Sequence, residues 1–291
     1  VNPSLSIIYK LNYAWRFTVH ASYKERYGEM TDLYDRPYQT DYRNSVWNCG
    51  ILPVYRQQLY SVYGEYKNTA REFFATVNLT HNREWYNRIY EQRIENGQVQ
   101  RVSLPLSNHG SGYTVKSTLS KGFYDLGLKT SLLALLNISK AEQISGGQRL
   151  PYQYRLMRLE PKVIWTPNRH WETSYQTDIR YGGSKIGERT RLAPLWNVIQ
   201  QVQLSYIFSP IEASLSVDHY HNDVNEDQSV NAVFADFSVS WKSGRWQITA
   251  TATNLFDKRT YANTRYASLE SYTSWVRIRP REFLVAIRYR L

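Results

Sequence analysis

Apolar and polar residues alternate with a period of two along most of this chain, and that pattern predicts strands rather than helices. Residues 171–181 show it clearly. One face of this segment carries Trp171, Thr173, Tyr175, Thr177, Ile179 and Tyr181, and the other carries Glu172, Ser174, Gln176, Asp178 and Arg180. Such segments number about 13, so the chain is predicted to be all-β. They are residues 3–9, 15–23, 58–67, 72–86, 112–120, 126–139, 154–165, 171–181, 196–208, 211–221, 230–241, 246–256 and 281–291.

The connections between these segments alternate between short and long. The short ones are 10–14, 68–71, 121–125, 166–170, 209–210 and 242–245, and the long ones are 24–57, 87–111, 140–153, 182–195, 222–229 and 257–280. Outer-membrane barrels have short periplasmic turns and longer extracellular loops. Roughly 9–11 residues of tilted strand cross a bilayer, which several segments reach. The sequence therefore predicts an antiparallel transmembrane β-barrel, with about 13–14 strands in this chain.

Aromatic residues make up 15% of the 291 residues, with 25 Tyr, 9 Trp and 9 Phe, which excludes a disordered chain. Many lie at strand ends, where a membrane barrel has its aromatic girdles: Trp15, Tyr23, Trp165, Trp171, Tyr181, Trp196, Phe208, Trp241, Trp246 and Phe256. A water-soluble all-β sandwich or barrel, with these residues in its core, is the alternative. It would leave the apolar outward face of nearly every strand unexplained.

Charge and motifs exclude several functions. The net charge is +11, but basic residues are interspersed with acidic ones along the strands, so we expect no nucleic-acid binding. The single cysteine, Cys49, excludes a disulfide scaffold. No phosphate-binding, zinc-protease or nucleophile motif is present, so we predict neither enzyme activity nor a cofactor. His219, His221 and Asp223 have the spacing of metal ligands on one strand face, but a polar strand end is the preferred interpretation, and no metal is predicted.

The C-terminal residues resemble those of TonB-dependent outer-membrane receptors. The sequence ATATNLFDKRTY at 250–261 contains the Asn-Leu-Phe-Asp form of a motif that ends the penultimate strand in that family. Pro280 and Arg281 then open an alternating final strand, as in the family. Residues 3–26 and 219–242 look similar to the same family.

The resemblance implies an insertion signal on the last strand that the barrel-assembly machinery reads. Its lipid-facing residues are Phe283, Val285, Ile287, Tyr289 and Leu291. The chain differs from the usual pattern because it ends in Leu291, where outer-membrane barrels usually end in Phe. An apolar terminus is kept, so we expect weakened rather than lost insertion.

The resemblance also implies a 22-stranded barrel filled by a plug domain, with a segment that contacts TonB. The plug and that segment are absent from these residues, so a plug from the same or another chain is expected. Strand direction, tracked back from the last strand, places the start of the first strand outside the cell. Because a single-chain barrel has an even number of strands, the odd count predicts that residues 1–291 are the C-terminal portion of a larger barrel.

Two sets of residues are candidates for function. Aromatic residues of the first long loop are the predicted ligand contacts, because aromatic faces stack on flat ligands: Tyr34, Tyr38, Tyr42, Trp47 and Tyr55. Loop 87–111 is the second candidate. The polar face is predicted to face the lumen and the plug through Arg16, His20, Lys116, Lys129, Arg155, Glu172, Asp178, Arg180, Glu212, Asp218, Asp236, Arg288 and Arg290.

The sequence is thus interpreted as an outer-membrane nutrient receptor, in which this chain supplies barrel wall and ligand-binding loops. Expected partners are outer-membrane lipid, lipopolysaccharide, the plug, TonB and a surface lipoprotein that caps the barrel. The phosphates of lipopolysaccharide would pair with basic residues at the extracellular rim. Two alternatives stay open. One is a passive pore of about 14 strands without a plug. The other is a surface adhesion protein built on a sealed barrel.

Overall fold

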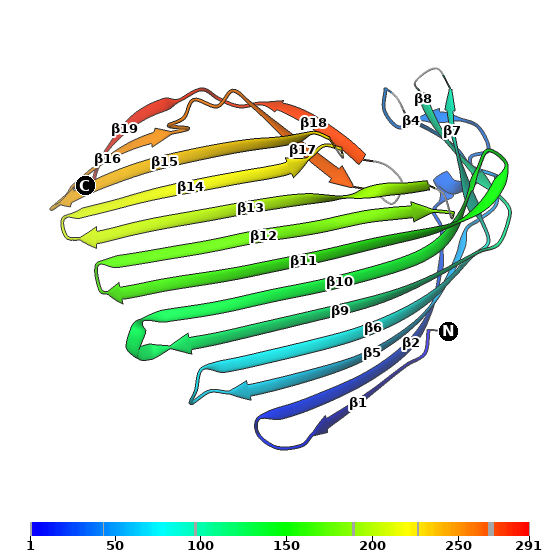
Figure 1. Ribbon diagram of the computed structural model, residues 1–291, viewed down its shortest axis with the longest axis horizontal. Helices are drawn as coiled ribbons and strands as arrows, with labels where there is room; N and C mark the ends of the chain where they lie inside the picture. The colour runs from blue at the N-terminus through cyan, green and yellow to red at the C-terminus, as the bar shows by residue number, and fades with distance from the viewer. Residues whose placement is uncertain are drawn as a thin grey trace.

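The structure of this chain is a computed structural model, which describes residues 2–42, 44–95, 98–187, 190–225, 227–266 and 271–290. In these residues, thirteen strands pair one after another into a single curved antiparallel sheet (Figure 1). In order across the sheet they are β1 (Ser4–Lys10), β2 (Trp15–Tyr27), β5 (Val54–Asn68), β6 (Phe73–Tyr86), β9 (Asn108–Phe123), β10 (Leu128–Ser145), β11 (Gln148–Asn168), β12 (Trp171–Ile186), β13 (Thr190–Phe208), β14 (Ile211–Asp223), β15 (Ser229–Ser243), β16 (Trp246–Thr253) and β19 (Glu282–Tyr289). The predicted all-β antiparallel architecture is confirmed.

The sheet has two open edges. Among the described strands, β1 pairs only with β2, and β19 pairs only with β16. The short turns all lie at one end of the sheet, and the long connections lie at the other (Figure 1). β1 begins at the end with the long connections, and β19 ends at the end with the short turns, so the two edge strands run in the same direction.

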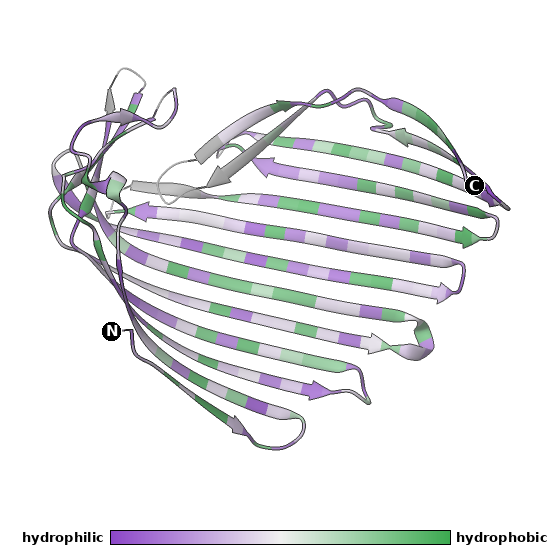
Figure 2. Ribbon diagram, turned by 180° about the vertical axis from the view of Figure 1, so that it is seen from behind, coloured by the Kyte–Doolittle hydropathy of each residue, from purple (hydrophilic) through white to green (hydrophobic). Residues whose placement is uncertain are grey.

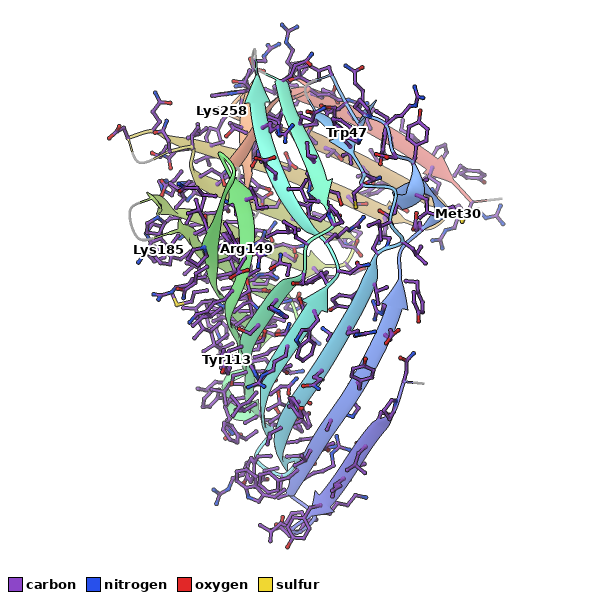
Figure 3. All side chains as sticks on the ribbon, turned by 90° about the vertical axis from the view of Figure 1, so that its right-hand side faces the viewer. Met30, Trp47, Tyr113, Arg149, Lys185 and Lys258 are labelled. Atoms are coloured by element: carbon purple, nitrogen blue, oxygen red, sulfur yellow. The ribbon has the colours of Figure 1, made fainter. Side chains whose placement is uncertain are left out.

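Cross-strand pairing divides the side chains into two faces, because residues directly opposite each other in a sheet point the same way. A single apolar row crosses seven strands and consists of Val19, Val62, Leu79, Val115, Leu136, Met157 and Tyr181. Figure 2 shows the resulting alternation of apolar and polar bands along each strand. The apolar face is convex, and its residues Tyr113 and Lys185 lie on the outer side of the arc (Figure 3).

The convex apolar face is bare. Val19 and Leu79 are each 48% exposed although they lie in the middle of long strands. No second layer of the described residues covers them. A soluble β-sandwich would bury this face against a second sheet, and a bare apolar surface of this extent marks a partner or a membrane. The arrangement therefore argues against the water-soluble alternative.

Two rows of aromatic rings border the apolar band on the convex face. At the short-turn end, the ring centroids of Trp171 and Tyr206 lie 4.6 Å apart, and those of Trp246 and Tyr289 lie 4.8 Å apart. At the other end, the ring of Tyr181 lies 4.6 Å from that of Trp196. Ten positions along β12 separate the two rows, or about 33 Å of strand. At a tilt of about 40° the band is roughly 25 Å tall, which matches the hydrocarbon height of a membrane barrel.

The strands are longer than the sequence predicts at two places. Residues 140–153 and 182–195 are predicted loops, but β10, β11, β12 and β13 continue through most of them as paired hairpins. The apolar alternation stops at these residues because they lie beyond the aromatic row, whereas the backbone pairing continues. Their ladder is therefore held by hydrogen bonds rather than by an apolar face.

The remaining long connections contain short elements of their own. These are η1 (Met30–Leu33), β3 (Tyr38–Gln39), β4 (Asn44–Trp47), β7 (Ile89–Glu95), β8 (Gln98–Leu104), β17 (Thr260–Tyr266) and β18 (Ser271–Arg277), and the turn before β10 contains η2 (Tyr124–Leu126). In the part of the chain that the structure describes, no helix is long and apolar enough to cross a membrane.

Val217 lies midway between the aromatic rows on the convex face, opposite Val202 and Ala235. Replacing it by Arg places a charge at the centre of the apolar band, so Val217→Arg is expected to lower the free energy of unfolding by about 2–4 kcal/mol in phospholipid bilayers. Denaturant unfolding of the protein folded into bilayers measures this change. The control is Ser216→Arg, which puts the same charge on the opposite face. Equal losses for both variants would contradict the assignment of the faces.

Candidate ligand-binding site

Two long loops that are distant in sequence fold together at the long-connection end of the sheet. β4 from loop 24–57 pairs in parallel with β8 from loop 87–111, with Asn44 opposite Val99 and Trp47 opposite Val102. β7 and β8 form an antiparallel hairpin, and β3 pairs with β4. We call η1, β3, β4, β7 and β8 the loop module. The sequence predicts the two loops separately but gives no signal for their pairing.

The loop module has a buried core of the kind found in soluble proteins. Ile89 is fully buried, and Val102 is 6% exposed. Ser103 is also buried, and its hydroxyl lies 3.4 Å from Cys49 Sγ. The buried amide of Asn48 donates a 3.2 Å hydrogen bond to the carbonyl of Thr31 and so ties η1 to the loop beyond β4. The module is therefore a packed unit rather than a set of independent loops.

An ion pair fixes η1 against the start of β7. Arg88 Nη1 lies 2.8 Å from Asp32 Oδ1, and both side chains are largely buried. Burial opposes ionisation of Asp32, but the hydrogen bonds from Arg88 and from the backbone of Glu29 lower the pKa of this carboxyl below its usual value. Arg88 and Arg101 lie over the ring of Tyr90, at 5.0 Å and 3.7 Å from its centre. Burial raises the pKa of the Tyr90 hydroxyl in spite of these cations.

The long β10–β11 hairpin supports the module from below. Glu91 of β7 pairs in parallel with Ile144 of β10 and is 7% exposed. Its carboxylate accepts hydrogen bonds from Arg93, at 2.9 Å and 2.7 Å, and from the backbone N–H of Gly147 at the hairpin tip, at 3.3 Å. The extension of this hairpin beyond the apolar band thus positions the module.

Four of the five predicted aromatic contacts lie in the loop module. Tyr34, Tyr38, Tyr42 and Trp47 are exposed by 53%, 38%, 74% and 38%. The rings of Tyr34 and Tyr38 meet edge to face at 6.1 Å, and with Met30 and Thr31 they line an open hollow of about 510 Å³. The indole of Trp47 donates a 3.0 Å hydrogen bond to Asp35. The fifth residue, Tyr55, lies in the wall.

Tyr55 belongs to a polar cluster on the concave face. Its hydroxyl donates a 3.0 Å hydrogen bond to Glu84. The same carboxylate accepts hydrogen bonds from Gln57 at 3.1 Å, from Asn82 at 2.7 Å and from Tyr86 at 2.7 Å. The structure therefore brings Tyr55 together with residues of the concave face and not with the hollow of the loop module.

The register places most of the predicted lumen residues on one face, opposite the apolar rows. These are Arg16, His20, Lys116, Lys129, Glu172, Asp178, Arg180, Glu212, Asp218, Asp236 and Arg288. Arg290 lies just beyond the end of β19. Arg155 differs, because it pairs with Ile138 and shares the convex face with Met157. Leu156 and Ile164 are apolar residues on the polar side of β11, so the alternation of this strand is irregular. This irregularity explains why the sequence assigns Arg155 to the wrong face.

Ion pairs link neighbouring strands on the concave face. Arg158 of β11 lies 2.9 Å from Asp178 of β12, which also pairs with Arg180 at 2.6 Å. Lys242 lies 2.7 Å from Glu212 on the adjacent strand. Arg16 and Glu65 form a further pair at 2.6 Å. The polar face is thus a set of cross-strand contacts with charge of both signs.

The last long connection folds back against the wall, a feature that the sequence gives no sign of. β17 and β18 form a hairpin, and Tyr261 at its start packs against Tyr220 and Phe234 at 5.1 Å and 6.3 Å between ring centres. Both belong to the concave face. The fully buried amide of Asn222 donates hydrogen bonds to the Tyr261 hydroxyl at 3.0 Å and to the Ala262 carbonyl at 3.1 Å.

Asn254, the first residue of the Asn-Leu-Phe-Asp motif, closes the base of this connection. Its side-chain amide donates hydrogen bonds to the carbonyls of Lys258 at 2.8 Å and of Arg279 at 2.9 Å, and its oxygen accepts from the Lys258 N–H at 3.0 Å. Asn254 has a φ of 51° and Asp257 one of 49°, a left-handed conformation that Asn and Asp tolerate. Asp257 accepts a 2.9 Å hydrogen bond from the N–H of Arg281. The motif thus holds both ends of the loop together.

The histidines near the end of β14 do not form a metal site. His221 lies 3.2 Å from Asp223 and 2.9 Å from the amide oxygen of Asn231. In the described residues, no group of three or more His, Cys, Asp or Glu side chains is arranged to hold a metal ion.

The predicted insertion residues lie along one edge of the sheet. Phe283, Val285, Ile287 and Tyr289 lie on the convex face of β19, opposite Ala252, Ala250, Ile248 and Trp246. Leu291 lies outside the described residues.

No family model matches this sequence, and no curated protein matches it. The siderophore receptor PiuA from Acinetobacter baumannii is similar in structure, with a TM-score of 0.50 and 7% identity over 90% of this chain and 47% of PiuA. The ferric yersiniabactin uptake receptor FyuA from Yersinia pestis gives a TM-score of 0.45 and 9% identity over 100% of this chain and 50% of FyuA. The pyoverdine-bound receptor FpvA of P. aeruginosa gives a TM-score of 0.48 and 10% identity over 98% of this chain and 44% of FpvA.

The chain therefore spans about half the length of the solved receptors that it matches. At 7% identity, the likeness to PiuA shows a shared fold and nothing about a ligand.

Substitution of Asn254 tests the role of the motif. Asn254→Ala removes three hydrogen bonds at the base of the last loop, so residues 258–279 are expected to become susceptible to trypsin after Lys258 and Arg259. Limited proteolysis of the folded protein measures the cleavage rate. The control is Asn225→Ala, which removes one bond within another loop. Cleavage at the wild-type rate in Asn254→Ala would contradict the clamping role.

Proposed function

We propose that this chain forms the C-terminal part of the barrel of an outer-membrane TonB-dependent nutrient receptor. It supplies barrel wall and extracellular ligand-binding loops. The observation that carries the proposal is the two-faced sheet, whose bare convex band is roughly 25 Å tall between two aromatic rows. Short turns at one end and a folded loop module at the other give the sheet the polarity of an outer-membrane barrel.

The open edges of the sheet support the view that further strands complete the barrel. β1 and β19 run in the same direction, so they cannot pair with each other as neighbours in an antiparallel barrel. An unpaired strand edge in a bilayer leaves backbone groups without partners, at a cost of several kcal/mol each. We therefore place this chain beside other strands, with a plug domain against its concave ion pairs and TonB acting through that plug.

The loop module is the proposed ligand site. The hollow beside Tyr34 and Tyr38 presents aromatic rings to the outside, and the packed core below holds them in place. Binding residues on loops are effective when a rigid scaffold positions them. Tyr42 and Trp47 add two further exposed aromatic rings to the loop module. The ligand class that this surface suits is one with flat or apolar faces.

A passive pore is the second candidate, because the concave face is polar along its length, as in water-filled barrels. Electrical recording distinguishes the two functions. The native protein that carries this chain, purified intact and inserted into a planar bilayer, is expected to show no steady conductance, since a plug fills a receptor at rest. A porin of known conductance in the same membrane is the control. A constant ohmic current from the native protein would favour the passive pore.

Growth assays test the ligand site. A strain that lacks the native protein is first compared with its parent on defined media, each with one nutrient at a limiting concentration. The nutrient on which only the parent grows is identified as the ligand. Tyr34→Ala and Tyr38→Ala are then expected to raise the concentration for half-maximal growth about tenfold each, since a lost aromatic contact costs roughly 1–1.5 kcal/mol.

The matched control is Tyr124→Ala, which removes an 88% exposed tyrosine from the short-turn end of the sheet. It is expected to leave the growth curve unchanged. If the three variants behave alike, the ligand does not bind at the hollow of the loop module.

A further inference from the structure

A row of cations crosses the convex face just beyond the outer aromatic row. Arg83 on β6 pairs with Ser111, which pairs with Lys140 on β10. Lys140 pairs in turn with Gln153, which pairs with Lys185 on β12. We call Arg83, Lys140 and Lys185 the basic row. All three are exposed, and among the described residues none of them forms an ion pair or a side-chain hydrogen bond.

A hollow of about 320 Å³ lies between the first two cations of the basic row. It spans β6, β9 and β10, and its lining includes Arg83, Trp85, Ser111 and Lys140. Ser111 lies between the two cations with a short side chain, which leaves room for a group there. Two strand spacings separate Arg83 from Lys140, about 10 Å. Both charged groups can therefore reach one anionic group placed in the hollow.

The carboxylates beside the hollow are already paired. Glu142 lies 2.9 Å from Arg149. The Glu84 carboxylate lies on the concave face, where the Tyr55 cluster donates four hydrogen bonds to it. The charge left over at the hollow is therefore positive.

The basic row lies directly above the membrane band. Two residues nearer the middle of the sheet, β6 and β9 carry aromatic rings, because Arg83 follows His81 and Ser111 precedes Tyr113, whereas β10 carries Ile138 at this level. The rings of His81 and Tyr113 stack at 4.4 Å, and the ring of Tyr60 stacks on the other side of His81 at 6.4 Å. The row Leu79, Val115 and Leu136 follows beneath them.

We propose that the basic row and its hollow bind the phosphate-bearing headgroup of a lipid in the surrounding leaflet, with the acyl chains on the apolar rows below. Only an amphiphile anchored in the membrane meets both surfaces at once. Cations on a protein surface at headgroup level attract anionic lipids by about 1 kcal/mol each. Arg83 adds the fork geometry that suits phosphate oxygens. This assignment rests on the proposed placement of the chain in an outer membrane.

Lipid retention tests the assignment. The native protein that carries this chain is reconstituted into phosphatidylcholine nanodiscs that contain a small share of diphosphorylated lipid A, or of the same lipid without phosphates. Native mass spectrometry then counts the lipids retained on the protein. The wild type is expected to retain the phosphorylated lipid selectively, and Arg83→Gln/Lys140→Gln is expected to bind it about thirtyfold more weakly, because two cations are lost. Arg83→Lys, which keeps the charge, is expected to retain most of the binding.

The matched control is Lys116→Gln/Lys129→Gln, which removes two charges from the concave face. It is expected to retain lipid as the wild type does. Equal retention by the Arg83→Gln/Lys140→Gln variant and the wild type overturns the lipid site, and so does release of the lipid by excess inorganic phosphate, which would make the site one for a free anion. Failure of the wild type to insert into nanodiscs overturns the proposed function instead.

Discussion

The structure depends on one constraint, the hydrogen bonding of the backbone between neighbouring strands. A bilayer interior offers no water to unpaired N–H and C=O groups, so each strand must be satisfied by the strands beside it. The antiparallel ladder from β1 to β19 meets that requirement along most of its length, with local irregularities at Pro161 of β11 and at Gly182–Ser184 of β12, and leaves its two edges open. Once the register is fixed, every side chain is assigned to one of two faces. The convex apolar rows and the concave ion pairs follow from the same ladder.

Beyond the outer aromatic row the backbone no longer has to be paired between strands, and the chain folds there as a water-soluble protein does. Water can satisfy the backbone there, so the loops are free to leave the sheet. The loop module uses this freedom to build a small core around Ile89 and Val102. The ion pair between Arg88 and Asp32 holds η1 against this core, and the Glu91 contacts attach the core to the hairpin below. One chain therefore combines a sheet with a bare apolar face and, at one end of that sheet, a loop module with a buried core like that of a water-soluble protein.

Period-two alternation predicts the thirteen wall strands because each must present one face to an apolar phase. The alternation stops where the apolar surroundings end. The sequence therefore predicts loops at residues 140–153 and 182–195, although most of these residues are paired in strands. Arg155 is misassigned because Leu156 and Ile164 lie on the polar face of its strand. Two further contacts join residues that are far apart in sequence: β4 pairs with β8, and Asn222 hydrogen-bonds to Tyr261. No local sequence pattern encodes such contacts.

The Asn-Leu-Phe-Asp motif is a case in which a residue pattern is visible in the sequence but its physical role is not. The left-handed backbone of Asn254 and its three side-chain hydrogen bonds join the start and the end of the last loop. An amide is suited to this place because it donates and accepts at once. The sequence pattern alone shows only that the motif resembles one found in a known family, and the structure shows the contacts that the motif makes in this chain.

The parallel pairing of β4 with β8 bears on how such a surface can diverge during evolution. Loop length is usually the feature of a scaffold that changes most freely. Here a one-residue insertion that shifts β4 would turn its side chains to the opposite face and break their match with β8. An insertion that shifts β4 therefore requires a compensating change in the loop that carries β8. Point substitutions outside the paired residues, at Tyr34 and Tyr42, leave the ladder intact, so the proposed ligand surface can vary at these positions without a change in the pairing of the two loops.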